Sequence, residues 1–163
     1  MSTSFTLLWV EDEADDVFLG ERALVKAGFA KPMIVRDGEQ AVDYLSGNGD
    51  YSDRARFPLP SLVLLDLKLP RISGFEVLKW IRQHEAVRRI PVIILSSSRE
   101  QQDITLAYDF GANAFLVKPV DTQMFSALFR SLQSFWAGFN MNSDATPEAV
   151  RQFSGGWRNP QEE

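Results

Sequence analysis

With 163 residues, 45% of them hydrophobic, the chain is long enough for one domain with a buried core and a short tail. Its net charge is −5, and it has no basic cluster longer than Arg88-Arg89, which argues against a nucleic-acid binder. The chain has no cysteine and one histidine, so we expect neither a disulfide framework nor a zinc site with cysteine or histidine ligands. No apolar run approaches the roughly 20 residues that cross a membrane, and no basic region precedes the first run, so we expect a cytoplasmic protein without membrane contact.

Short apolar runs alternate with longer amphipathic stretches, which is the pattern of βα units around a parallel sheet. The runs predict strands at Phe5–Val10, Met33–Val35, Leu62–Leu65, Val92–Leu95 and Ala114–Val117. The stretches predict helices at Asp16–Ala27, Glu39–Leu45, Phe75–Gln83, Glu100–Phe110 and Thr122–Ala137. Strict alternation of this kind predicts an α/β fold, with a doubly wound five-stranded parallel sheet and helices on both of its faces.

Two segments fall outside this alternation. Gly47–Pro60 is long for a connection and rich in Gly, Asn, Asp, Ser and Pro, which predicts an exposed loop. The composition from Gly138 onward is similar, yet Thr146-Pro147-Glu148 has the pattern of a helix N-terminus. We therefore expect a domain at 1–139 and a C-terminal tail at 140–163, which is either a short helix or a disordered end.

Charged and polar side chains follow four of the predicted strands. Glu11 and Asp12 follow the first, Asp66 the third, Ser96 the fourth and Lys118 the fifth. In an open parallel sheet the carboxyl ends of the strands border the ligand crevice, so we expect these side chains to meet there. Two carboxylates about 4 Å apart repel each other by roughly 4 kcal/mol at an effective dielectric of about 20, so three of them require positive charge.

Lys118 supplies one positive charge, and a hard divalent cation would supply more. Oxygen ligands without histidine or cysteine favour Mg²⁺, which keeps several waters and accepts phosphoryl oxygens. The residues alone therefore indicate a site that receives a phosphoryl group.

In this order, the same residues resemble the receiver domain of bacterial two-component response regulators, over Thr6 to about Phe135. The matching features are Glu11-Asp12, Asp66 with Pro70 and Gly74, Ser96-Ser97, and Lys118-Pro119. The resemblance implies the flavodoxin-like strand order 2-1-3-4-5. It also implies a phosphoacceptor and not an enzyme with turnover: a protein that catalyses only its own phosphoryl transfer and autodephosphorylation.

The resemblance assigns roles to the acidic residues and the lysine. Asp66 would be the nucleophile that takes the phosphoryl group as an acyl phosphate. Mg²⁺ would be held by Asp12, Asp66, Glu11 and the backbone carbonyl of Lys68. Lys118 would pair with the phosphoryl oxygens, and the Lys118-Pro119 bond is a candidate for the cis form.

Further residues would control access and switching. The Ser96 hydroxyl would hydrogen-bond the phosphoryl group after transfer, and the small Ser97 would leave the path of attack open. Phe115 stands where the family has its switching aromatic residue, but it lacks a hydroxyl group. Lys68, two residues after Asp66, is a second departure, and it leaves the lifetime of the phosphorylated state open.

The resemblance also implies partners. The chain has no stretch for an output domain, which implies a single-domain regulator that signals by conformational change, docking or onward transfer to a phosphotransfer protein. The loop Gly47–Pro60 and the sequence Asp66-Leu-Lys-Leu-Pro are similar to those of the small regulators associated with bacterial phytochromes. That similarity implies a light-regulated sensor histidine kinase as the donor, docked at the first helix.

Two apolar stripes run along the predicted helix Thr122–Ala137. The first contains Met124, Leu128, Leu132, Phe135 and Phe139, and the second contains Phe125, Phe129 and Trp136. A single core-facing stripe would need only the first. The second stripe then predicts a homodimer across this helix, extended by the tail. The alternative is one broad, deeply packed helix.

Two other functions remain open. Phosphatases of the haloacid dehalogenase type also use an aspartate nucleophile, Mg²⁺, a later Ser or Thr and a lysine, but they need a second aspartate where this chain has Lys68. An interaction module that works without phosphorylation is the other alternative. It would not need the complete set of site residues.

Overall fold

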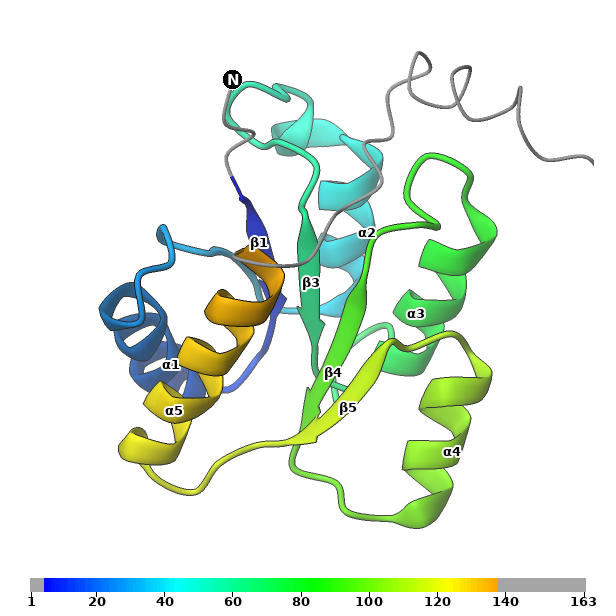
Figure 1. Cartoon of the computed structure of the whole chain (residues 1–163). Coiled ribbons are helices and arrows are strands. Elements are labelled where there is room, and N and C mark those ends of the chain that lie inside the picture. Colours follow the sequence, from blue (N-terminus) through cyan, green and yellow to red (C-terminus); the bar gives the residue numbers. More distant parts are fainter. Residues whose placement is uncertain (1–4, 138–163) are drawn as a thin grey trace, which may run out of the picture.

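Five parallel strands form the centre of the fold, in the order β2-β1-β3-β4-β5 (Figure 1). The computed structural model describes residues 5–137. The strands are β1 (Leu7–Val10), β2 (Met33–Val35), β3 (Leu62–Leu65), β4 (Val92–Ser96) and β5 (Ala114–Val117). The predicted fold class and strand order are confirmed, and the largest difference in strand bounds is at β1, which begins two residues after the expected Phe5.

Five helices cover the two faces of the sheet. They are α1 (Ala14–Lys26), α2 (Gly38–Ser46), α3 (Gly74–Gln83), α4 (Gln101–Asp109) and α5 (Thr122–Leu132). Figure 1 shows α1 and α5 on one face and the other three helices on the opposite face. Because side chains alternate along a strand, each strand contributes to both cores: Leu7 and Trp9 of β1 lie under α1 and α5, while Leu8 and Val10 face the other way.

The predicted fifth helix is divided in the structure. Regular α-helix ends at Leu132, and a π-helical turn, η2 (Gln133–Ala137), continues it. None of the helices in the described part of the chain is long and apolar enough to cross a membrane.

Both apolar stripes of α5 contribute to the core: Leu132 of the first stripe is buried, and Leu128 packs partly against the same core. Phe125 and Phe129 are buried against the sheet, whereas Met124 is 57% exposed and Phe135 is 56% exposed. Trp136 also packs partly against this core. The predicted dimer contact is therefore wrong for Phe125 and Phe129, because these two residues offer almost no surface to a partner, and it stays a prediction for the half-buried Trp136. The tail expected to extend that contact lies outside the described residues.

The segment 47–60 has more structure than the exposed loop predicted for it. It contains a short 3-10 turn, η1 (Gly49–Tyr51), and the Arg54 guanidinium donates hydrogen bonds to the carbonyl oxygens of Tyr44 (2.7 Å) and Leu45 (2.8 Å) at the end of α2. Tyr51 packs on Tyr44, with ring centroids 5.2 Å apart. Arg54 thus satisfies carbonyl groups that a helix end leaves without partners.

Replacing Arg54 by alanine should lower the free energy of unfolding by about 2 kcal/mol, because hydrogen bonds from a charged donor to half-buried carbonyls would be lost. Urea denaturation would measure the loss. Arg56→Ala is the control, since the exposed Arg56 guanidinium lies only over the Phe57 ring, 5.2 Å from its centroid. An equal loss in both variants would contradict the capping role of Arg54.

Candidate functional site

The backbone at the carboxyl ends of β1, β3 and β5 places three charged side chains together. The Glu11 N–H donates to the Val35 carbonyl (3.0 Å), and the Asp66 N–H donates to the Val10 carbonyl (3.1 Å). The Lys118 N–H donates to the Ser96 carbonyl (2.8 Å). Each bond continues the hydrogen-bond ladder of the sheet by one residue. The sheet therefore fixes the backbone positions from which these three side chains extend.

The Lys118 ammonium group is the centre of the site. Its Nζ atom lies 2.9 Å from Glu11 Oε1, 3.0 Å from Asp66 Oδ2 and 3.0 Å from Asp16 Oδ2. The lysine side chain is only 9% exposed, so water screens these contacts weakly. An ammonium group has three N–H donors, and the three carboxylates use all of them.

The sequence did not identify Asp16 as part of this cluster. It placed Asp16 on the first helix, near the surface expected to meet a kinase. In the structure Asp16 stands in the first turn of α1 and turns toward the site, with its side chain 31% exposed. No spacing in the sequence indicates this contact, because Asp12 precedes the helix and only Asp16 belongs to it.

Burial changes the protonation of two of these groups. Glu11 is fully buried, and burial together with the charge of Asp66 raises its pKa to about 7, although the hydrogen bond from Lys118 opposes this. Burial alone would lower the pKa of Lys118, but its hydrogen bonds to Glu11 and Asp66 raise that pKa above its usual value. Lys118 is therefore charged at neutral pH, while Glu11 is close to half protonated.

The acidic side chains form a set of oxygen ligands. Glu11, Asp12 and Asp66 each offer one carboxylate oxygen, and these three atoms lie within 4.8 Å of one another. Both Glu11 oxygens lie 2.9 Å from Lys118 Nζ, but the hydrogen bond goes to Oε1, and the buried Oε2 accepts none from the described residues. Three carboxylate oxygens this close together fit a hard divalent cation.

The other predicted site residues lie nearby with different exposure. The Lys68 side chain is exposed, and its backbone N–H donates to Asp66 Oδ1 (3.3 Å). Ser96 is buried and accepts a hydrogen bond from the Ser98 N–H (3.2 Å), whereas Ser97 is exposed. Phe115 is half-buried on β5 and packs against the core under α3 and α4.

The expected cis bond between Lys118 and Pro119 is not found. The peptide bonds of the described residues are all trans. Lys118 Nζ lies 3.0 Å from Asp66 Oδ2 with this bond trans, so the direction of the lysine toward the site does not require the cis form.

Replacing Glu11 by glutamine should remove a pH dependence of the stability. Glu11 has an ordinary pKa of 4.5 and a pKa of about 7 in the folded protein, so the folded state retains a proton that the unfolded chain releases. In the metal-free parent, the free energy of unfolding should therefore fall by about 2 kcal/mol between about pH 5.5 and pH 8. Urea denaturation in the presence of EDTA would measure this.

Comparing the parent with the Glu11→Gln variant at each pH isolates the contribution of this residue. The variant should gain stability relative to the parent as the pH rises. With a divalent cation at about pH 8, the parent should instead be more stable than the variant, because the cation stabilises only the charged carboxylate. A constant difference between the two proteins across this pH range would contradict the prediction.

Three comparisons agree on the family. The family model of the response regulator receiver domain matches residues 7–130 of this chain. The response regulator Rcp1 of Synechocystis sp. is 34% identical over 131 residues, which are 80% of this chain and 87% of Rcp1. The Mn²⁺-bound form of Rcp1 superposes with a TM-score of 0.76 at 32% identity, covering 85% of this chain and 98% of that one.

Two further solved structures are similar. The response regulator RPA3017, described in red light signalling of R. palustris, has a TM-score of 0.79 at 38% identity and covers 85% of this chain and 97% of its own. The bacteriophytochrome response regulator AtBRR has a TM-score of 0.67 at 43% identity, over 84% of this chain and 98% of its own. The chain therefore belongs to the response regulator receiver domain family.

Proposed function

We propose that this chain is a response regulator that accepts a phosphoryl group on Asp66 from a sensor histidine kinase. The observation that carries the proposal is the setting of Asp66. Asp66 is 3% exposed, its carboxylate lies 3.0 Å from the Lys118 ammonium, and it stands beside two further carboxylates that could hold a cation with it. An isolated buried aspartate would be costly, and this arrangement offsets that cost with charges suited to phosphoryl oxygens.

The proposed transfer forms one bond and breaks one. An Asp66 oxygen attacks the phosphorus of a phosphohistidine, the P–N bond breaks, and its electron pair leaves with the imidazole nitrogen. Asp66 becomes an acyl phosphate, and Lys118 pairs with the charge on the phosphoryl oxygens. Glu11, Asp12, Asp66 and the Lys68 carbonyl would hold Mg²⁺, which when bound neutralises further negative charge.

Ser96 and Phe115 are the proposed switch. Ser96 Oγ accepts a hydrogen bond from Ser98, so its own hydroxyl hydrogen can be donated to a phosphoryl oxygen on Asp66. A shift of Ser96 toward that oxygen would open space beside β4, and the half-buried Phe115 ring on the neighbouring strand could fill it. Ser97 is exposed and small, which leaves access to Asp66.

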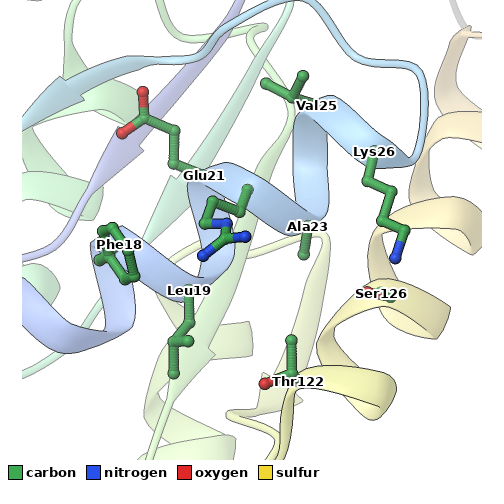
Figure 2. Close-up of a pocket in the computed structure, with 9 residues that line it drawn as sticks. Phe18, Leu19, Glu21, Ala23, Val25, Lys26, Thr122 and Ser126 are labelled. Carbon is green, nitrogen blue, oxygen red and sulfur yellow. The ribbon is translucent and has the colours of Figure 1, made fainter.

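The kinase is proposed to dock over the groove between α1 and α5. Figure 2 shows this groove, which Phe18, Leu19, Val25 and Thr122 line. Phe18 is 60% exposed and Val25 is 53% exposed, and both lie on the helix that carries Asp16. The similarity to AtBRR and to RPA3017 supports a light-regulated kinase as the donor. A downstream phosphotransfer protein could use the same groove.

A homodimer through α5 remains part of the proposal, with different contacts from those first expected. Met124 and Phe135 offer exposed apolar surface on α5 and η2, in place of the buried Phe125 and Phe129. Sedimentation velocity with and without a phosphoryl analogue would test it, with Met124→Glu as the disrupting variant. A monomer at high concentration in both states would exclude the dimer.

Incubation with acetyl phosphate and Mg²⁺ tests the proposed acceptor. Intact-mass spectrometry should show the addition of one phosphoryl group to the parent, none to Asp66→Asn, and none to the parent in EDTA. No added mass in the parent, where another receiver domain gains it, would overturn the proposal. Repeated hydrolysis of a phosphate ester would instead favour a phosphatase of the haloacid dehalogenase type, although Lys68 stands where that family needs its second aspartate.

A further inference from the structure

Asp16 differs from the other two partners of Lys118. Glu11 and Asp66 belong to the oxygen trio that can hold a cation, and Asp16 does not. Asp16 Oδ2 lies 3.0 Å from Lys118 Nζ, as close as Asp66 Oδ2 does. Within residues 5–137, three carboxylates bond to the lysine. Asp16 is the one among them that would not be a ligand of a cation bound by the trio.

A bound cation would weaken the other two contacts of the lysine. It would share the charge of Glu11 and Asp66 with the ammonium group and would repel that group, since both carry positive charge. Phosphoryl transfer would then convert the Asp66 carboxylate into an acyl phosphate, which moves the negative charge from the carboxylate to the phosphoryl oxygens. The lysine would then need a hydrogen-bond partner that neither event removes. Asp16 is such a partner, because it already accepts a hydrogen bond from Lys118 Nζ.

We propose that Asp16 is a positioning residue, which keeps the Lys118 ammonium directed at the phosphoryl group once the cation is bound. This inference rests on the proposed function of Asp66. Because Asp16 stands in the first turn of α1, its bond also ties the loop after β5 to the helix that borders the docking groove. Occupancy of the site is thereby linked to the position of α1.

Asp15 provides a matched control on the same helical turn. It is an acid in the first turn of α1, as Asp16 is, so both interact with the helix dipole in the same way. Asp15 is exposed and has no hydrogen bond or ion pair with Lys118 in the described structure. A difference between the two alanine variants therefore measures the contact with the lysine and not the loss of an acid from the helix end.

The first measurement is the rate of phosphorylation by acetyl phosphate in Mg²⁺. At saturating donor, Asp16→Ala should slow the formation of phosphorylated protein about tenfold, which is what the loss of a charge-assisted hydrogen bond would produce. Asp15→Ala should stay within about twofold of the parent. Asp16→Asn keeps an acceptor oxygen of the same reach, so its rate should fall between those of the parent and the alanine variant.

The second measurement needs no phosphoryl donor. Modification of Lys118 by an amine-reactive reagent, followed by peptide mass spectrometry, reports how firmly the ammonium group is held. In Mg²⁺ the Asp16→Ala variant should react about fivefold faster than the parent, and in EDTA the increase should be smaller, because Glu11 and Asp66 still hold the lysine. A purely structural role of Asp16 would give the same increase with and without the cation.

The outcomes separate this inference from the proposed function. If the parent is phosphorylated but Asp16→Ala matches Asp15→Ala in both measurements, the positioning role is wrong and the proposed function stands. If the parent is not phosphorylated, the proposed function fails, while the labelling still tests the contact between Asp16 and Lys118. Should the alanine variant fail to fold by circular dichroism, Asp16→Asn takes its place in both measurements, with Asp15→Asn as its control.

Discussion

Replacing Lys118 by methionine is expected to lower the free energy of unfolding of the metal-free protein by roughly 3–5 kcal/mol at about pH 8, the cost of leaving buried charge without its partner. Glu11 is fully buried and Asp66 is 3% exposed, and both lose the ammonium group that offsets their repulsion. Methionine has a similar length and no charge, so the change removes the ion pairs and preserves most of the packing. Urea denaturation in EDTA would measure the loss.

Two conditions should restore stability to the methionine variant. At about pH 5.5 Glu11 is protonated in the fold, because its pKa of about 7 lies above that pH even with the lysine present, so part of the repulsion disappears. A divalent cation at about pH 8 should also restore stability, since it replaces the missing positive charge. The gain with cation should be larger for Lys118→Met than for the parent.

Lys31→Met is the matched control for charge removal. Lys31 pairs with Glu21 at 3.3 Å, but its side chain is 78% exposed, so the variant should change the stability by less than about 1 kcal/mol. A loss in Lys118→Met that neither lower pH nor cation reduces would contradict the electrostatic explanation and would indicate a packing defect.

The parts of the site that could be predicted depend on topology alone. In a parallel sheet all strands end at the same edge, so Glu11, Asp66 and Lys118 could be placed at that edge once their strands were identified. Asp16 could not be placed in this way, because its contact depends on the rotation of α1 about its axis. Helix rotation is set by packing against neighbours, which periodicity in one sequence only partly constrains.

Helix α5 and the segment 47–60 show the same limit. Two neighbouring apolar stripes on α5 leave its rotation undetermined, and the structure buries Phe125 and Phe129 of one stripe together with Leu132 of the other. The composition of the segment 47–60 predicted a loop correctly, but the hydrogen bonds from Arg54 to the end of α2 join residues that no local pattern connects. Long-range polar contacts of this kind follow from the fold and are not visible in the order of residues.

Trp9 and Gly20 form a complementary pair whose exchange should have a large effect. Trp9 is fully buried in β1, and a Cβ atom at Gly20 of α1 would lie 2.6 Å from Trp9 Cζ3 and still closer to Cη2. The glycine thus lets α1 pack directly onto the indole ring, which also meets Phe129 edge-on at 6.0 Å between centroids. Trp9→Ala should lower the free energy of unfolding by about 3–5 kcal/mol through the cavity it leaves.

A double-mutant cycle would identify the pair. Gly20→Leu alone should also destabilise the protein, because its side chain has no space beside the indole ring. In the Trp9→Ala background the same leucine enters the cavity, so the double variant should be more stable than Trp9→Ala alone, with a coupling energy of about 2 kcal/mol or more. Additive losses would show that α1 moves away from the sheet to accommodate the new side chain. Since α1 carries Asp16, that movement should also break the Asp16 contact with Lys118 and speed the labelling of the lysine.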